Sequence, residues 1–157
     1  MTDSTRVVFD CNTFLQALAS PEGPAGQCVQ LAIDRKINLF VSPSVLEELR
    51  EVTSRPKVIT RLRLHTNRVE EFFEAIEIAA TLLVGFPEVF SYPRDPDDAH
   101  YVNLALAADA KLIVSRDRDL LDLMDLTKVE AADFQKRFPA LRILNPVEFL
   151  FEIRSQK

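Results

Sequence analysis

Four short apolar runs, separated by longer segments with helical periodicity, constrain the fold of this chain more than any other feature. The runs occupy residues 7–9, 39–41, 112–114 and 141–144. Each is bounded by polar or turn residues, which is the pattern of a short buried strand. The other segments predict helices over residues 24–35, 43–54, 66–83, 97–109, 128–138 and 146–154.

Strands that alternate with helices pair in parallel, so the pattern predicts an α/β fold. We expect a three-layer sandwich whose central parallel sheet has four or five strands. A further strand is expected near residues 88–90, where Pro87 and Pro93 bracket the run. Asn145, Pro146 and Glu148 together predict a well-defined helix start. In folds of this class, ligands bind at the carboxyl ends of the strands.

The length and composition favour one globular domain over residues 1–157. The chain is 47% hydrophobic, which is enough to bury one core, and it is too short for two ordinary domains. No apolar stretch approaches the roughly 20 residues that span a bilayer, so no membrane association is expected. The polar N-terminus resembles no export signal, and Cys11 and Cys28 are too few for a zinc framework. These features predict a cytoplasmic protein.

Two acids follow predicted strands directly. Asp10 comes after the run at 7–9, and Asp117 comes shortly after the run at 112–114. A buried carboxylate at a strand end is costly unless something pairs with it, and no Lys or Arg lies in the first turn after Asp10. A bound cation is therefore expected to serve as the partner.

Helix phase selects two more acids. Val45 and Leu49 define the apolar arc of the helix at 43–54, and Glu48 borders this arc whereas Glu47 points to solvent. In the helix at 97–109 the same test places Asp98 on the buried side and Asp97 off it. Asp98 is then either a helix cap or a ligand, and taken alone the cap is the simpler interpretation.

The four acids together are typical of a site for a hard cation such as Mg²⁺ or Mn²⁺, which prefers carboxylate oxygens. His65 and His100 form no cluster with them and are interpreted as surface residues. Such a centre would generate a hydroxide nucleophile for attack on a phosphate. An alternative without function remains, in which all four acids are caps or surface charges.

The net charge of −5 is unusual for a nucleic-acid enzyme, because phosphate contacts call for clustered Lys and Arg. Metal bound to four carboxylates would cancel much of the local negative charge. Basic residues also gather within residues 55–68 and on both sides of Asp117. The residues expected to contact RNA are Arg55, Lys57, Arg116 and Arg118.

The sequence resembles the PIN-domain nucleases, in particular the bacterial branch of toxins from toxin-antitoxin pairs. The resemblance extends over nearly the whole chain. Its blocks are VFDCN at 8–12, SPSVLEEL at 42–49, SRPK at 54–57, DPDDA at 95–99 and IVSRDRDLL at 113–121. Any one block is weak evidence, but the ordered set is specific.

The resemblance implies a metal-dependent endoribonuclease that acts on RNA, a homodimer, and a small antitoxin partner. The implied catalytic and metal-binding residues are Asp10, Glu48, Asp98 and Asp117. Asn12 and Ser115 match positions that support the metal site in relatives. Asp119 matches another common acid, although we expect it to cap the short helix that follows. The segment at 122–140 is longer than in compact relatives and carries its own amphipathic helix.

Two other classes of protein compete with this interpretation. Receiver domains and haloacid-dehalogenase-like phosphatases also place acids at strand ends, but the phosphatases need Asp-x-Asp where this chain has Asp10-Cys11-Asn12. A receiver needs adjacent acids ahead of its phosphorylated aspartate. The second alternative is a non-catalytic PIN-like module that binds RNA or a protein partner, and retention of all four acids speaks against it.

Overall fold

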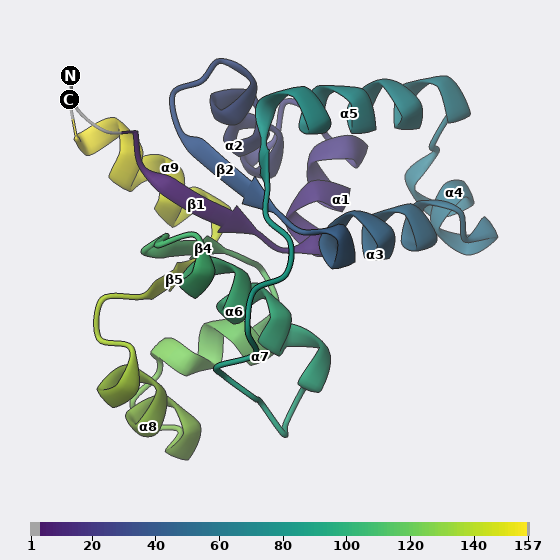
Figure 1. Cartoon of the computed structure of the whole chain (residues 1–157). Helices are drawn as coiled ribbons and strands as arrows, with labels where there is room; N and C mark the ends of the chain where they lie inside the picture. Colours follow the sequence, from purple (N-terminus) through teal and green to yellow (C-terminus); the bar gives the residue numbers. More distant parts are fainter. Residues whose placement is uncertain (1–3, 157) are drawn as a thin grey trace.

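The computed structural model describes residues 4–156. These residues form a five-stranded parallel sheet with helices around it (Figure 1). Its strands are β1 (Arg6–Phe9), β2 (Asn38–Val41), β3 (Thr81–Leu82), β4 (Leu112–Val114) and β5 (Arg142–Leu144). They lie in the order β3-β2-β1-β4-β5, and every neighbouring pair is parallel. The predicted α/β class and the parallel sheet are therefore confirmed.

Helices cover both faces of this sheet. They are α1 (Cys11–Ala19), α2 (Pro24–Ile33), α3 (Pro43–Thr53), α4 (Pro56–Leu62), α5 (Thr66–Ala79), α6 (Ala99–Ala107), α7 (Arg118–Leu121), α8 (Val129–Arg137) and α9 (Pro146–Ser155). α2 packs against α1, α5 and α9, whereas α6 packs against β1, β2 and β4. The chain proceeds outward from β1 to β3 and then returns through α6 to β4. Because such crossovers are right-handed, this reversal places α6 on the opposite face of the sheet.

The core forms where the strands are buried on both faces. Val7, Val8 and Phe9 in β1 are fully buried, as are Ile113 and Val114 in β4. A central parallel strand has no solvent face, so its sequence is continuously apolar and does not alternate. This explains why the strands appear in the sequence as short uninterrupted apolar runs.

Side-chain caps start two of the predicted helices. The Ser42 hydroxyl accepts a hydrogen bond from the Val45 amide at the start of α3, at 3.3 Å. At the start of α9, Asn145 Oδ1 accepts from the Glu148 amide at 2.8 Å, and Glu148 Oε1 accepts from the Asn145 amide at 3.0 Å. This reciprocal pair is a capping box, as the sequence predicted.

The fifth strand is not where we expected it. Residues 88–90 form no strand, and the edge strand is Thr81–Leu82. Residues 88–90 instead bond to one side chain of α6: Asn103 Oδ1 accepts from the amides of Val89 and Phe90, and Asn103 Nδ2 donates to the Phe90 carbonyl. A side-chain amide thus provides the hydrogen bonds that a neighbouring strand would have provided.

Other helix boundaries also differ from the prediction. The helix predicted over 66–83 ends at Ala79, because the chain turns there into β3. The helix predicted over 97–109 begins with a 3₁₀ turn at Pro96–Asp98. Helices α1 and α4 were not predicted. α4 is short, and only Asp10, which caps α1, separates α1 from β1.

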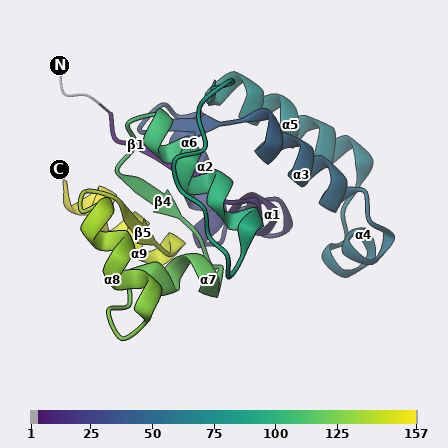
Figure 2. The same cartoon turned by 60° about the horizontal axis from the view of Figure 1, so that its bottom comes forward.

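The connection from β3 to α6 is held against the C-terminal third of the chain. It runs alongside α6 and ends near α7, as Figure 2 shows. The Phe90 ring packs edge-on against Phe134 of α8 and against Phe138. The predicted amphipathic helix at 128–138 therefore exists as α8, and its apolar face covers this connection. Among residues 4–156, no helix is both long and apolar enough to cross a membrane.

Candidate active site

The strand order reverses between β1 and β4, and the candidate site lies at their carboxyl ends. β1 connects outward to β2 on one side, and β4 adds to the other side of β1. Helices diverge from such a point to opposite faces, which leaves room for a ligand. Asp10 follows β1 directly, and Ser115 follows β4.

Asp10 is 3% exposed, and hydroxyl and amide donors form hydrogen bonds to both oxygens of its carboxylate. Oδ1 accepts from the Thr13 amide at 2.8 Å and from the Thr13 hydroxyl at 2.6 Å, and Oδ2 accepts from the Ser115 hydroxyl at 2.5 Å. Burial raises the pKa of Asp10, although these hydrogen bonds oppose the shift. Thr13 and Ser115 thus provide partners for the Asp10 carboxylate within the protein, and the expectation that a bound cation also pairs with Asp10 stays a prediction.

Ser115 connects the ends of the two strands. Its hydroxyl donates to Asp10 and accepts from the Asp117 amide at 2.9 Å. Since Ser115 is fully buried, this hydroxyl has few alternative orientations. It therefore fixes the start of the segment at 115–119 relative to Asp10, which is compatible with the supporting role expected for it.

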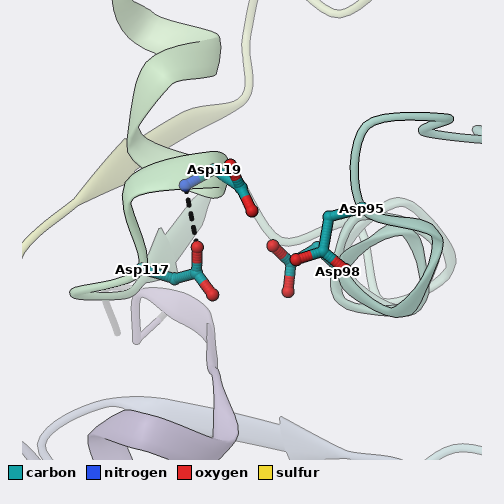
Figure 3. Close-up of side chains that lie close together, drawn as sticks. All are labelled: Asp95, Asp98, Asp117 and Asp119. Carbon is teal, nitrogen blue, oxygen red and sulfur yellow. Dashed lines mark hydrogen bonds between the residues drawn. The ribbon is translucent and has the colours of Figure 1, made fainter.

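Asp117, and not Asp119 as we expected, caps the short helix α7, and both carboxylates belong to one group of acids. Asp117 caps α7, with its Oδ1 accepting from the Asp119 amide at 2.7 Å. The prediction that Asp119 caps this helix was wrong, because Asp119 is already the second residue of α7. Its carboxylate instead points toward the other acids (Figure 3).

Four aspartates converge from two segments of the chain (Figure 3). Asp98 ends the 3₁₀ turn before α6 and Asp95 directly precedes that turn, and both face Asp117 and Asp119 from the segment that enters α7. One carboxylate oxygen from each of the four lies within 4.8 Å of those of the others. We call this group the acidic cluster. Asp95 was not predicted, since its place in a helix start suggested a cap, but it makes no side-chain capping bond.

Asp98 is 7% exposed, and its Oδ2 is buried without a hydrogen-bond partner. Burial raises the pKa of Asp98 to about 8, and the nearby charges of Asp117 and Asp95 add to this effect. Burial also raises the pKa of Asp95, with Asp119 beside it contributing. A divalent cation would relieve this repulsion and satisfy the unpaired oxygen, so the residues present fit a hard metal ion.

Glu48 lies outside the acidic cluster, on the half-buried side of α3 as helix phase predicted. The Tyr101 hydroxyl donates to Glu48 Oε1 at 2.5 Å and accepts from the Cys11 amide at 3.0 Å. Tyr101 thereby connects Glu48 to the backbone beside Asp10. Burial alone would raise the pKa of Glu48, but the hydrogen bonds from His100 and Tyr101 outweigh it and lower the pKa.

His100 is not the surface residue that we expected. Its Nε2 lies 3.4 Å from Glu48 Oε1, and its ring lies 3.9 Å from the Tyr101 ring, measured between centroids. The His100 Nδ1 atom is buried and has no hydrogen-bond partner. Sequence patterns do not predict this contact, because His100 and Glu48 belong to different helices.

The remaining predicted residues are exposed. Asn12 is exposed in the first turn of α1. Arg116 and Arg118 are exposed on either side of the half-buried Asp117, and Lys57 is exposed on α4. Arg55 is exposed as well, but it forms an ion pair with Glu51 at 2.6 Å. Arg116 and Arg118 are therefore exposed cations that directly adjoin a residue of the acidic cluster in sequence.

Comparison with known proteins agrees with this architecture. The family model described as the PIN domain matches residues 6–119, so the chain belongs to the PIN-domain family. An uncharacterized protein of Methanocaldococcus jannaschii is 32% identical over 150 residues, which are 96% of this chain and 92% of that protein.

A chain in the crystal structure of VapBC2 from Rickettsia felis, bound to a DNA fragment from their promoter, has a similar fold. The TM-score is 0.52 at 13% identity, and the match covers 90% of this chain and 98% of that one. The fold and the family model together identify this protein as a member of the PIN-domain class.

Proposed function

We propose that this protein is a metal-dependent endoribonuclease that hydrolyses RNA phosphodiester bonds. The observation that carries the proposal is the acidic cluster at the strand-order reversal, with the buried and unpaired Oδ2 of Asp98 inside it. Four carboxylates this close are electrostatically costly to a protein that binds no cation there. A nuclease of this family has a direct use for such a site.

Asp98 and Asp117 would hold Mg²⁺ or Mn²⁺, together with Asp95 and Asp119 of the same cluster. When bound, the metal would supply a hydroxide nucleophile and stabilise the leaving oxygen. The buried Asp10 would hold Ser115, and through it Asp117, in place beside the metal. Glu48, fixed by Tyr101, would orient water or the substrate next to the metal ligands.

The exposed cations beside the site would bind the phosphate backbone. Arg116 and Arg118 flank Asp117, while Lys57 and Arg55 lie further out on and before α4. Asn12, exposed in the first turn of α1, would contact either the metal-bound water or the RNA. Bound metal would cancel much of the charge of the acidic cluster, so the negative net charge would not prevent an RNA strand from approaching.

We further propose that this nuclease is the toxin of a toxin-antitoxin pair. The similarity in fold to a chain of the VapBC2 complex supports this role. A small antitoxin would then cover the acidic site, and the protein would act in the cytoplasm, as a homodimer, on cellular RNA. Co-purification of a small protein encoded beside this gene, with loss of the nuclease activity, is the test of this part.

The test of the catalytic proposal compares two adjacent aspartates. Asp98→Asn is expected to lower the cleavage rate of single-stranded RNA in Mg²⁺ or Mn²⁺ by at least about 100-fold, because one metal ligand is lost. Asp97→Asn is the matched control, since Asp97 is exposed and lies outside the acidic cluster. EDTA is expected to abolish cleavage by the parent protein.

Equal cleavage by the Asp98→Asn variant would contradict the proposed centre. The alternative function is a non-catalytic PIN-like module that binds RNA or a protein partner. RNA binding without cleavage, unaffected by Mg²⁺, Mn²⁺ or EDTA, would favour that alternative.

A further inference from the structure

One cation already contacts the acidic cluster. The Arg94 guanidinium donates from Nε to Asp119 Oδ1 at 2.7 Å and from Nη2 to Asp122 Oδ2 at 2.6 Å. Its side chain is 31% exposed, and that of Asp122 is 9% exposed. Among the ion pairs formed within residues 4–156, only the pair of Arg94 with Asp119 includes a carboxylate of the acidic cluster.

Arg94 also connects the two segments that form the cluster. It directly precedes Asp95 in the chain, yet its guanidinium bonds to the segment that contains Asp119. The Tyr92 hydroxyl donates to the carbonyl of Asp119 at 2.9 Å and makes the same connection without a charge. The segments would therefore stay joined through Tyr92 if the guanidinium were removed.

A guanidinium in this position has two opposite effects on the site. It lowers the repulsion among four carboxylates when no metal is present. It also repels a divalent cation in the cluster, and it occupies an oxygen of one of the cluster's acids. The first effect stabilises the metal-free protein, and the second weakens metal binding.

We propose that Arg94 is an internal counter-ion of the acidic cluster, which stabilises the metal-free protein and lowers the affinity of the site for divalent metal. This inference rests on the proposed function, because it assumes that the cluster binds metal. Arg94 acts on the metal through Asp119, so it is a positioning residue. It sets the metal concentration at which the site fills.

The test is Arg94→Gln, which keeps much of the side-chain length and removes the charge. We expect Mn²⁺ to bind the variant roughly three- to tenfold more tightly, as measured by calorimetry. We also expect the melting temperature in EDTA to fall by a few degrees, on the order of 2–6 °C. Arg94→Lys keeps the charge, and its Mn²⁺ affinity should stay within about twofold of the parent value.

Arg142→Gln is the matched control. Arg142 forms a bidentate ion pair with Glu152, at 2.6 and 2.8 Å, and it lies at the opposite end of the sheet from the acidic cluster. Its loss is expected to leave the Mn²⁺ affinity unchanged.

Three results would overturn the inference. Weaker Mn²⁺ binding by Arg94→Gln would show that Arg94 only clamps the two segments together. Unchanged affinity would show an ordinary surface ion pair, and an unchanged melting temperature in EDTA would remove the counter-ion role. Absence of Mn²⁺ binding by both the parent and Arg94→Gln would instead contradict the proposed metal site itself.

Discussion

Asp98 stores electrostatic free energy in the metal-free protein. Its carboxyl group is buried, one of its oxygens has no partner, and Asp95 and Asp117 lie beside it. The folded chain therefore holds a proton on Asp98 at pH values where the unfolded chain has lost it. A buried carboxylate close to other acids is suited to bind a metal ion, and for the same reason it destabilises the metal-free protein.

This leads to a prediction for stability as a function of pH. The pKa of Asp98 rises from 3.8 to about 8 on folding, so the folded state binds more protons between these values. The free energy of unfolding in EDTA should fall as pH rises through this window, and no further loss from Asp98 is expected above it. Asp98→Asn removes this dependence. The variant should be more stable than the parent at pH 8.5 by about 1–3 kcal/mol, and closer to it near pH 4.

Urea unfolding at the two pH values measures this effect. Asp97→Asn, one residue away and exposed, should show no such difference. If Asp98→Asn were as unstable at pH 8.5 as the parent, the buried carboxylate would not be under repulsion.

Single residues could be predicted from sequence where one helix decides their environment. Glu48 and Asp98 are on the buried side of their helices, and Glu47 and Asp97 are exposed, as helix phase predicted. The role of Asp119 could not be predicted, because either Asp117 or Asp119 could cap the same short helix. Only the hydrogen-bond geometry distinguishes them.

At the scale of elements, the β3–α6 connection depends on α6 for its backbone hydrogen bonds. Asn103 is 4% exposed and satisfies three backbone groups of Val89 and Phe90. Residues 88–90, between Pro87 and Pro93, have the composition of a strand, but β3 occupies the edge position beside β2. A side-chain amide can replace a strand partner only in the tertiary structure, so the sequence pattern predicted the wrong element.

Asn103→Leu should therefore destabilise the protein. The leucine has a similar volume but leaves two amides and one carbonyl unpaired, which we expect to cost about 2–4 kcal/mol. Urea unfolding measures the loss, and hydrogen exchange should show faster exchange of the Val89 and Phe90 amides. Asn67→Leu, at an exposed position of α5, is the control and should cost much less. An unchanged free energy of unfolding for Asn103→Leu would mean that this connection contributes nothing to stability.

At the scale of the whole molecule, charge is distributed unevenly. The net charge is −5, yet exposed Arg116 and Arg118 lie beside the acidic cluster. Such a surface should attract a polyanion only near these cations and only when metal neutralises the acids. Binding of RNA should therefore be local and strongly dependent on salt.

We expect Arg116→Gln and Arg118→Gln each to weaken binding of single-stranded RNA, measured in Mg²⁺ in the Asp98→Asn background. Each loss of one phosphate contact should reduce the slope of log affinity against log salt by roughly 0.7. Arg142→Gln, at the far end of the sheet, should leave the slope unchanged. Identical slopes for all three variants would exclude the flanking arginines from the RNA interface.

Local sequence was enough to predict the class of fold, the parallel sheet, the half-buried position of Glu48, the burial of Asp98 and the position of Asp10 at a strand end. These follow from local periodicity and from the apolar runs of strands buried on both faces. The packing of the folded chain was needed to show that Asp95 and Asp119 join Asp98 and Asp117, and that Arg94 bonds to Asp119. The reason is physical: this grouping depends on how two distant segments pack, and local patterns carry no information on distances between elements.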